Sequence, residues 1–294
     1  MASLKEVKSR INSINGTLKI TSAMKMVASA KLHKAQEAIE NMLPYESKLY
    51  GILRNFLASG VSVQTPFSIN KQVKKVAIVA FASNSSLCGG YNANVIRHLT
   101  ALIDEYSAKV GKENILIYPV GRKIAEAVKK MGMEVAGDYQ HMSGKPNYQD
   151  ASDLASELMT NFLKGEIQKV DLLYNHFKST SSQILTNETY LPVDVNGQVG
   201  GNEDAETKEQ ASDYIIEPSA EVIMESLVPK VLKMKIYTVL LDAAASEHAA
   251  RTMAMQIATD NANDLIQELT LVYNKSRQQA ITNELLDIVG GTMA

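Results

Sequence analysis

The C-terminal quarter of the chain constrains the fold more than any other segment. Pro218 and Ser219 favour a helix start, and no glycine follows until Gly290 and Gly291. We expect a helix of about 70 residues, on the order of 100 Å long, with a kink at Pro229 and a cap at the two glycines. A helix so much longer than the average indicates a coiled coil, which requires a partner helix along its length.

The N-terminal segment supplies that partner. Ser3 and Glu6 have the spacing of a capping box. Apolar or small side chains then recur every three or four residues, at Leu4, Val7, Ile11, Ile14, Leu18, Thr21, Ala28, Leu32, Ala35, Ile39 and Met42. Lys25 is the one charged interruption of this heptad stripe. The stripe predicts a helix that continues, with a kink at Pro44, to about Leu57 and is roughly 80 Å long.

The two ends of the chain differ in charge. Residues 1–60 hold nine Lys and Arg against four Asp and Glu, whereas residues 221–294 hold six against nine. Their signs are complementary, so pairing within the chain explains part of the basic character of the first helix. With a net charge of only -2, we expect binding neither to nucleic acid nor, through overall charge, to a membrane surface.

Between the end segments the pattern changes to alternating strands and helices. Two segments have the composition of buried strands, and each is followed by a helical stretch: Val73–Ser83 and Glu113–Gly121. Two later segments also have the composition of strands: Lys169–Phe177 and Ser182–Val193. This order predicts a Rossmann-like α/β domain with a partly parallel sheet. The expected organisation is a coiled-coil helix at 1–60, the α/β domain at 70–193, an acidic mobile loop and linker at 194–217, and a second coiled-coil helix at 218–294.

The turn after the first strand is where an α/β enzyme would hold a nucleotide. Its sequence, SNSSLCGGYN at Ser83–Asn92, contains neither GxGxxG nor GxxxxGK[ST]. Cys88 could be a thiolate nucleophile at such a turn, but the next arginine, Arg97, lies nine residues on and no motif pairs the two. A packing or contact role for Cys88 is therefore preferred.

Other chemistry lacks a pattern as well. The five histidines are scattered, none lies four residues from another, and no spacing singles out a pair of carboxylates. A single cysteine excludes an intramolecular disulfide. We therefore expect no catalytic residue, no cofactor and no metal site. No apolar run approaches the roughly 18 residues of a membrane span, and the N-terminus has no signal or transit pattern, so we expect a bacterial cytoplasmic protein that does not insert into the membrane.

Two stretches of the predicted helices carry more small and apolar surface than one partner helix can cover. They are Ile20–Leu32 and Leu240–Ala262. A tight interface rich in alanine would explain them within the chain. The length of the hairpin favours the alternative, in which other protein surrounds it, because a small central domain cannot cover 80 Å of helix.

Four long motifs resemble one family. TSAMKMVASAKLHKAQ, LCGGYN, ASEHAARTMAMQIATDNANDLI and LTLVYNKSRQQAITNELLDIVGG are similar to the gamma subunit of F-type ATP synthases, and the resemblance covers essentially the whole chain. One departure is visible, because the family commonly has Asp-Arg-Gly before LCGG where this chain has Asn84, Ser85 and Ser86. The departure puts in doubt any charged contact made by this turn.

The resemblance implies a rotor shaft. In the family the two terminal helices form an antiparallel coiled coil inside a ring of three alpha and three beta subunits, and the α/β domain sits below it against the epsilon subunit and the membrane c-ring. Proton-driven rotation of the c-ring turns the shaft, while the chemistry belongs to beta. The chain would then be a peripheral, non-catalytic subunit at the cytoplasmic face of the bacterial inner membrane.

The resemblance also assigns contact residues. Met24 matches a shaft methionine that faces a lever loop of beta, and Cys88 matches a position near the lower contact with beta. Four further positions match residues that contact alpha and beta near the top of the shaft: Arg277, Gln278, Thr282 and Glu284. Tyr214 and Glu217 match the foot that faces the c-ring. The alternative for Met24 is a methionine packed in the core. The alternative for the polar residues near the top of the shaft is that they are only solvated. A free coiled-coil adaptor and an α/β enzyme remain the competing functions.

Overall fold

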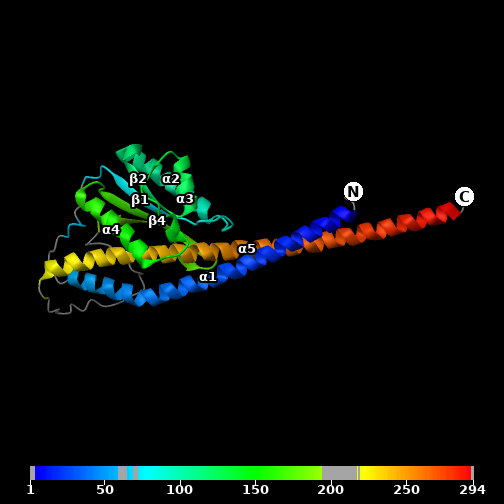
Figure 1. The fold of residues 1–294 in the computed structure, drawn as a ribbon, viewed down its shortest axis with the longest axis horizontal. Helices are drawn as coiled ribbons and strands as arrows, with labels where there is room; N and C mark the ends of the chain where they lie inside the picture. Colours follow the sequence, from blue (N-terminus) through cyan, green and yellow to red (C-terminus); the bar gives the residue numbers. More distant parts are fainter. Residues whose placement is uncertain (1–3, 59–64, 69–71, 194–216, 218, 293–294) are drawn as a thin grey trace.

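Two long helices dominate the molecule. The computed structural model describes residues 4–58, 65–68, 72–193, 217 and 219–292. Helix α1 (Leu4–Ala58) and helix α5 (Ala220–Thr292) lie side by side and run in opposite directions (Figure 1). This confirms the predicted antiparallel coiled coil. Ser3 of the predicted capping box lies outside the described residues.

Two prolines and two glycines were predicted to kink or to end the long helices, and neither pair ends one. Pro44 and Pro229 each lie inside a continuous helix. The predicted cap at Gly290 and Gly291 is wrong, because α5 continues through both glycines to Thr292. Gly291 does not adopt the positive φ of a left-handed cap. A glycine permits such a cap, but among the described residues nothing lies within 4 Å of a Cβ placed on Gly291 to favour the turn.

The seam between α1 and α5 follows the predicted heptad stripe. Val7, Thr21, Ala28 and Leu32 are buried, and every other stripe position is at least partly buried. Two hydrogen bonds fix the pairing: Thr259 donates to Thr21 over 3.0 Å and Thr238 donates to Glu46 over 3.2 Å. Continuing that pairing places the start of α1 opposite the region of Ser276. The end of α5 therefore extends alone past α1, as Figure 1 shows.

The central domain is a five-stranded sheet. Its strands are β1 (Val76–Phe81), β2 (Ile115–Val120), β3 (Glu134–Val135), β4 (Lys169–Ser179) and β5 (Ser182–Leu191), in the order β3-β2-β1-β4-β5. The first four are parallel and β5 is antiparallel to β4. The four predicted strands are confirmed. The sequence pattern did not reveal β3, because two residues are too short to show alternation.

Helices cover both faces of the sheet. They are α2 (Tyr91–Val110), α3 (Arg122–Lys130) and α4 (Tyr148–Lys164), with short 3-10 turns at Lys112–Asn114 and Gln140–Ser143. Side chains of β1 alternate between two cores: Val76, Ile78 and Ala80 pack with α2 and α3, whereas Ala77, Val79 and Phe81 pack with α4 and α5.

Helix α5 therefore has two roles in the fold. Its residues Met224, Leu232 and Leu240 belong to the same buried cluster as the sheet, and Leu49 and Leu53 of α1 join that cluster. Burial of this apolar surface is the largest favourable contribution to docking of the domain on the hairpin. The shaft helix is thus also one layer of the α/β domain, and the domain cannot turn against the hairpin without opening its core.

Candidate functional site: the shaft and the turn that contacts it

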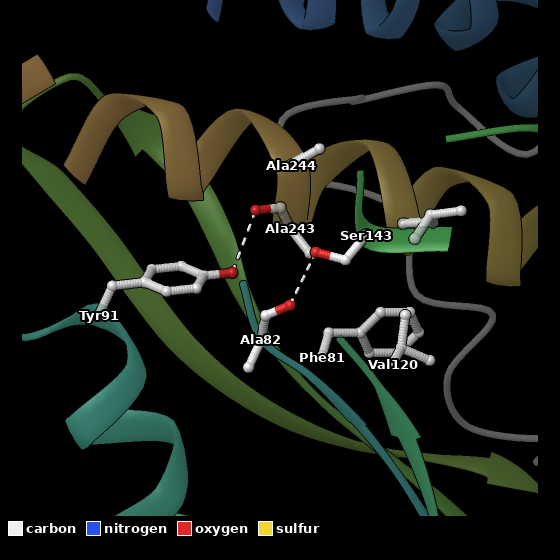
Figure 2. Close-up of a pocket in the computed structure, with 8 residues that line it drawn as sticks. Phe81, Ala82, Tyr91, Val120, Ser143, Ala243 and Ala244 are labelled. Atoms are coloured by element: carbon white, nitrogen blue, oxygen red, sulfur yellow. Dashed lines mark hydrogen bonds between the residues drawn. The ribbon is translucent and has the colours of Figure 1, made fainter. Parts of the chain in front are cut away.

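The crevice at the carboxyl end of β1 is filled by α5. In doubly wound sheets this is where ligands bind, since the chain leaves β1 toward β2 on one side and returns to β4 on the other. Here the Tyr91 hydroxyl donates to the carbonyl oxygen of Ala243 on α5 over 3.1 Å, and Ser143 donates to the carbonyl of Ala82 over 2.8 Å (Figure 2). The cavity between these side chains measures about 10 Å³, room for one water molecule at most. A shallower hollow of about 250 Å³ lies outside it, between the turn, the β4-β5 hairpin and α5, and it is lined among others by Gly90, Gln183 and Met253.

The turn that follows β1 is held by its own polar groups. The Ser83 hydroxyl donates to the carbonyl of Ser85 over 2.6 Å, and the Asn92 amide donates to the Cys88 sulfur over 3.2 Å. Cys88 is 1 % exposed. The thiol therefore packs inside the turn, and the contact with beta that the resemblance assigns to this position stays a prediction.

Leu87 is the large apolar side chain that the turn presents to solvent. It is 61 % exposed and has a φ of 67°. A leucine in the left-handed region is strained by about 1–2 kcal/mol, because its Cβ crowds the backbone. Such strain persists where surrounding structure fixes the turn, and it is characteristic of contact sites. Leu87 is not among the predicted contact residues, although an apolar residue in a polar turn is a weak signal for one.

A buried ion pair on α5 fixes the same turn. Arg251 donates to the carbonyl of Ser86 over 2.5 Å and to the carboxylate of Glu247 over 2.6 Å. Both side chains are almost fully buried. Burial raises the pKa of Glu247, and the hydrogen bond and charge of Arg251 oppose that rise. The spacing of four residues predicts a helical pair, but only the tertiary contact with Ser86 shows that this pair joins the turn to the shaft.

The middle of the shaft exposes apolar side chains around Met24. Met24 itself is partly buried, whereas Ile20, Met26 and Val27 are each more than half exposed on α1. On the facing helix, Ile257 is also more than half exposed. The predicted excess of apolar surface is therefore present around Met24 and Ile257. It is absent from residues 240–249, most of which the α/β domain and α1 of the same chain bury. Its assignment to a lever loop of beta stays a prediction.

The end of α5 is a helix without a partner in the described part of the chain. Arg277, Gln278, Thr282 and Glu284 are all exposed there, and Thr282 donates to the carbonyl of Gln278 over 2.9 Å. The exposed apolar residues of this end are Ile281, Leu285, Leu286, Ile288 and Val289. A single helix that exposes so much apolar surface is typical of a segment that binds other protein.

The predicted foot is described only in part. Tyr214 lies outside the described residues, and Glu217 is exposed. No described helix is long and apolar enough to span a bilayer. Within the described ranges, no group of three or more His, Cys, Asp and Glu side chains is arranged to hold a metal ion.

Comparisons with known proteins place the chain in one group. A family model described as ATP synthase matches residues 3–294. The ATP synthase gamma chain of Phocaeicola vulgatus is 66 % identical over 294 residues, covering 100 % of both chains. That of Bacteroides fragilis is 60 % identical over 294 residues, again covering 100 % of both.

Solved structures are similar in fold. A chain of the Euglena gracilis mitochondrial ATP synthase, solved as OSCP/F1/c-ring, aligns with a TM-score of 0.64 and 20 % identity, over 99 % of this chain and 93 % of that one. A chain from the central stalk/c-ring structure of the Tetrahymena thermophila enzyme aligns with a TM-score of 0.56 and 21 % identity, over 81 % and 99 %.

Proposed function

The chain belongs to the gamma chain family of ATP synthases, and on that premise we propose that it is the central rotor shaft of a bacterial F-type ATP synthase. It carries torque between the membrane c-ring and the catalytic ring of alpha and beta subunits. Proton translocation and ATP synthesis or hydrolysis are coupled through its rotation.

One observation carries this proposal: the hairpin is far longer than the domain that it carries, and its far end is apolar and extends past the described part of α1. Beyond the region of Ser276, α5 has no partner among the described residues, yet Leu285, Leu286 and Ile288 are each more than half exposed. An apolar helix of this kind is stable in water only when another protein covers it. A sleeve formed by alpha and beta subunits fits that requirement.

We further propose that the chain has no catalytic role. The crevice where an α/β enzyme would hold its ligand is filled by α5, through the bond from Tyr91 to Ala243. The turn beside it contains a buried thiol, Cys88, and lacks a phosphate-binding glycine motif. Both observations support a mechanical role, and they leave the chemistry to the beta subunit.

Torque transmission requires an asymmetric surface. A shaft that contacted all three beta subunits equally in every orientation would shift no equilibrium among their nucleotide sites. Met24 and the exposed residues around it lie on the hairpin, whereas the exposed Leu87 lies on the turn of the α/β domain beside it, so the subunit presents different side chains at different places. Met is well suited to a sliding contact, because its side chain is flexible and polarisable.

The remaining partners follow from the same proposal. The α/β domain and the lower ends of the helices would contact the epsilon subunit and the c-ring, and Tyr214 and Glu217 would face the c-ring. The subunit would be peripheral, at the cytoplasmic face of the bacterial inner membrane. Arg277, Gln278, Thr282 and Glu284 would contact alpha and beta near the top of the shaft.

Two experiments test the proposal. Immunoprecipitation of the chain from its detergent-solubilised native membrane should recover alpha, beta, epsilon and c subunits, identified by mass spectrometry. Recovery of the chain alone, or with unrelated helical proteins, would favour the coiled-coil adaptor. Titration calorimetry of the isolated full chain with ATP should show no stoichiometric binding at micromolar concentration. Such binding would favour the α/β enzyme.

A further inference from the structure

The β4 strand extends beyond its parallel neighbour. Pairing between β1 and β4 ends at Ala80 and Leu173, whereas β4 continues to Ser179. A strand edge without a neighbour exposes backbone groups that would otherwise pair with another chain. In this molecule α5 supplies partners for that edge.

Two side chains one helical turn apart make these bonds. An Asp242 carboxylate oxygen accepts from the backbone N–H of Phe177 over 2.7 Å, and the Ser246 hydroxyl donates to the carbonyl of Asn175 over 2.8 Å. The α5 side chains thus bind alternate residues of β4 as a neighbouring strand would. These contacts join the outer half of the β4-β5 hairpin directly to the shaft.

His176, between the two bonded β4 residues, adds a titratable contact. Its Nδ1 lies 2.6 Å from the second carboxylate oxygen of Asp242, so both oxygens of that carboxylate are engaged. The side chain of His176 is 46 % exposed, whereas that of Asp242 is 17 % exposed. Solvent can therefore exchange protons with the imidazole while the carboxylate stays in place.

Charged groups from three elements surround this pair. Lys235 comes from α5, as Asp242 itself does, Glu188 comes from β5 and Glu46 comes from α1. Lys235 forms a 2.9 Å ion pair with Glu188. The hydrogen bond with Asp242, opposed by burial and by the charge of Lys235, raises the pKa of His176 above its ordinary value of 6.5. The protonated imidazole is thus the form that this site stabilises.

We propose that His176 and Asp242 form a proton-dependent clasp, which holds the free edge of β4 on α5 more firmly when the imidazole is protonated. The charge-assisted bond then weakens to an ordinary hydrogen bond when the proton leaves. The added stability is fully present below the pKa of the unfolded chain, near 6.5, and is lost as pH rises through the higher pKa of the folded state. The β4-β5 hairpin therefore docks more tightly as pH falls.

The protection of the Phe177 amide from hydrogen exchange measures how firmly the clasp is closed, because that N–H donates to Asp242. Protection of this amide is measured in the full chain at about pH 6 and about pH 8.5, on either side of the ordinary histidine pKa, and corrected for the intrinsic exchange rate. We expect protection to fall severalfold at the higher pH. His176→Gln should abolish the pH dependence.

A second histidine provides the matched control. The side chain of His33 on α1 is 76 % exposed and lies 4.0 Å from that of Glu37. His33→Gln should leave the pH dependence at Phe177 unchanged. The proposal is wrong if protection at Phe177 is independent of pH in the wild type, or if His176→Gln shows the same pH dependence.

An NMR titration of the histidine side chains tests the cause. In the wild type His176 should titrate above its ordinary pKa, and Asp242→Asn should lower that pKa toward the ordinary value. An unchanged pKa in Asp242→Asn would remove the physical basis of the clasp.

Discussion

The buried pair of Arg251 and Glu247 gives the sharpest test of how the turn is joined to the shaft. Arg251→Met keeps most of the aliphatic volume but removes the guanidinium. Glu247, 7 % exposed, would then lose its ion pair, and the carbonyl of Ser86 would lose its donor. Breaking one side of a buried ion pair costs about 3–5 kcal/mol.

Urea unfolding of the full chain, followed by circular dichroism, measures that cost. Arg251→Met should lower the midpoint without changing the slope, and the loss would be a large fraction of a total stability of about 5–15 kcal/mol. The double variant Glu247→Leu/Arg251→Met should recover most of it, because an apolar pair leaves no buried charge.

A surface pair of the same geometry is the control. Glu105 and Lys109 are also four residues apart and also 2.6 Å from each other, but both are more than half exposed. Lys109→Met should not move the midpoint measurably. If Arg251→Met is no more destabilising than Lys109→Met, the buried pair does not hold the turn and this reasoning fails.

The pH dependence provides an independent check. Without Arg251, burial raises the pKa of Glu247 further, so the folded state of the variant favours the protonated acid. Stability from a raised carboxyl pKa is present below the unfolded value of 4.5 and is lost as pH rises through the folded pKa. The deficit of Arg251→Met should therefore be smaller at about pH 5 than at about pH 7, and a deficit that does not change would contradict this account.

Three further substitutions probe other surfaces. Met24→Lys would place a strongly hydrated ammonium where the proposed function needs a sliding apolar contact, so inverted vesicles should still hydrolyse ATP but pump fewer protons per ATP. Equal pumping would leave Met24 a packing residue. Leu87→Gly should relieve the strain at φ 67° and stabilise the chain by about 0.5–1 kcal/mol in urea unfolding, whereas a loss would mean that the leucine packs favourably. Ala245→Leu should overfill the fully buried contact with Leu32 and Ala249 and cost about 1–3 kcal/mol in the same assay, and a neutral result would indicate a loose seam.

The sequence predicted what depends on regular spacing. The heptad stripe from Leu4 to Met42 and the glycine-free run before Gly290 specify the two helices, because side chains that must face one partner recur with the helical period. The strands followed in the same way from short buried runs. The predicted cap at Gly290 and Gly291 was wrong, because such a cap also depends on packing contacts, and among the described residues none favours it at this end of α5.

The contacts between distant segments were not predictable. Arg251 and Ser86 are far apart in the sequence, and their bond exists only because α5 fills the crevice beside β1. Burial of Cys88 and exposure of Leu87 have the same origin, since neighbours in a turn can point in opposite directions. A single sequence contains the local periods, whereas the choice of which residue faces outward is made by the tertiary fold.

The layer that α5 contributes to the sheet also has a consequence for how the chain folds. Residues 76–191 form all five strands, but one of the two helices that cover this face of β1 begins only at Ala220. During synthesis the nascent sheet therefore waits for the last quarter of the chain, with Ala77, Val79 and Phe81 covered on that face by α4 alone. Contacts of such high sequence separation are slow to form, and exposed apolar strands are prone to aggregate meanwhile. A chaperone that protects this face before the ribosome finishes would raise the yield of folded chain more than one that acts on the hairpin.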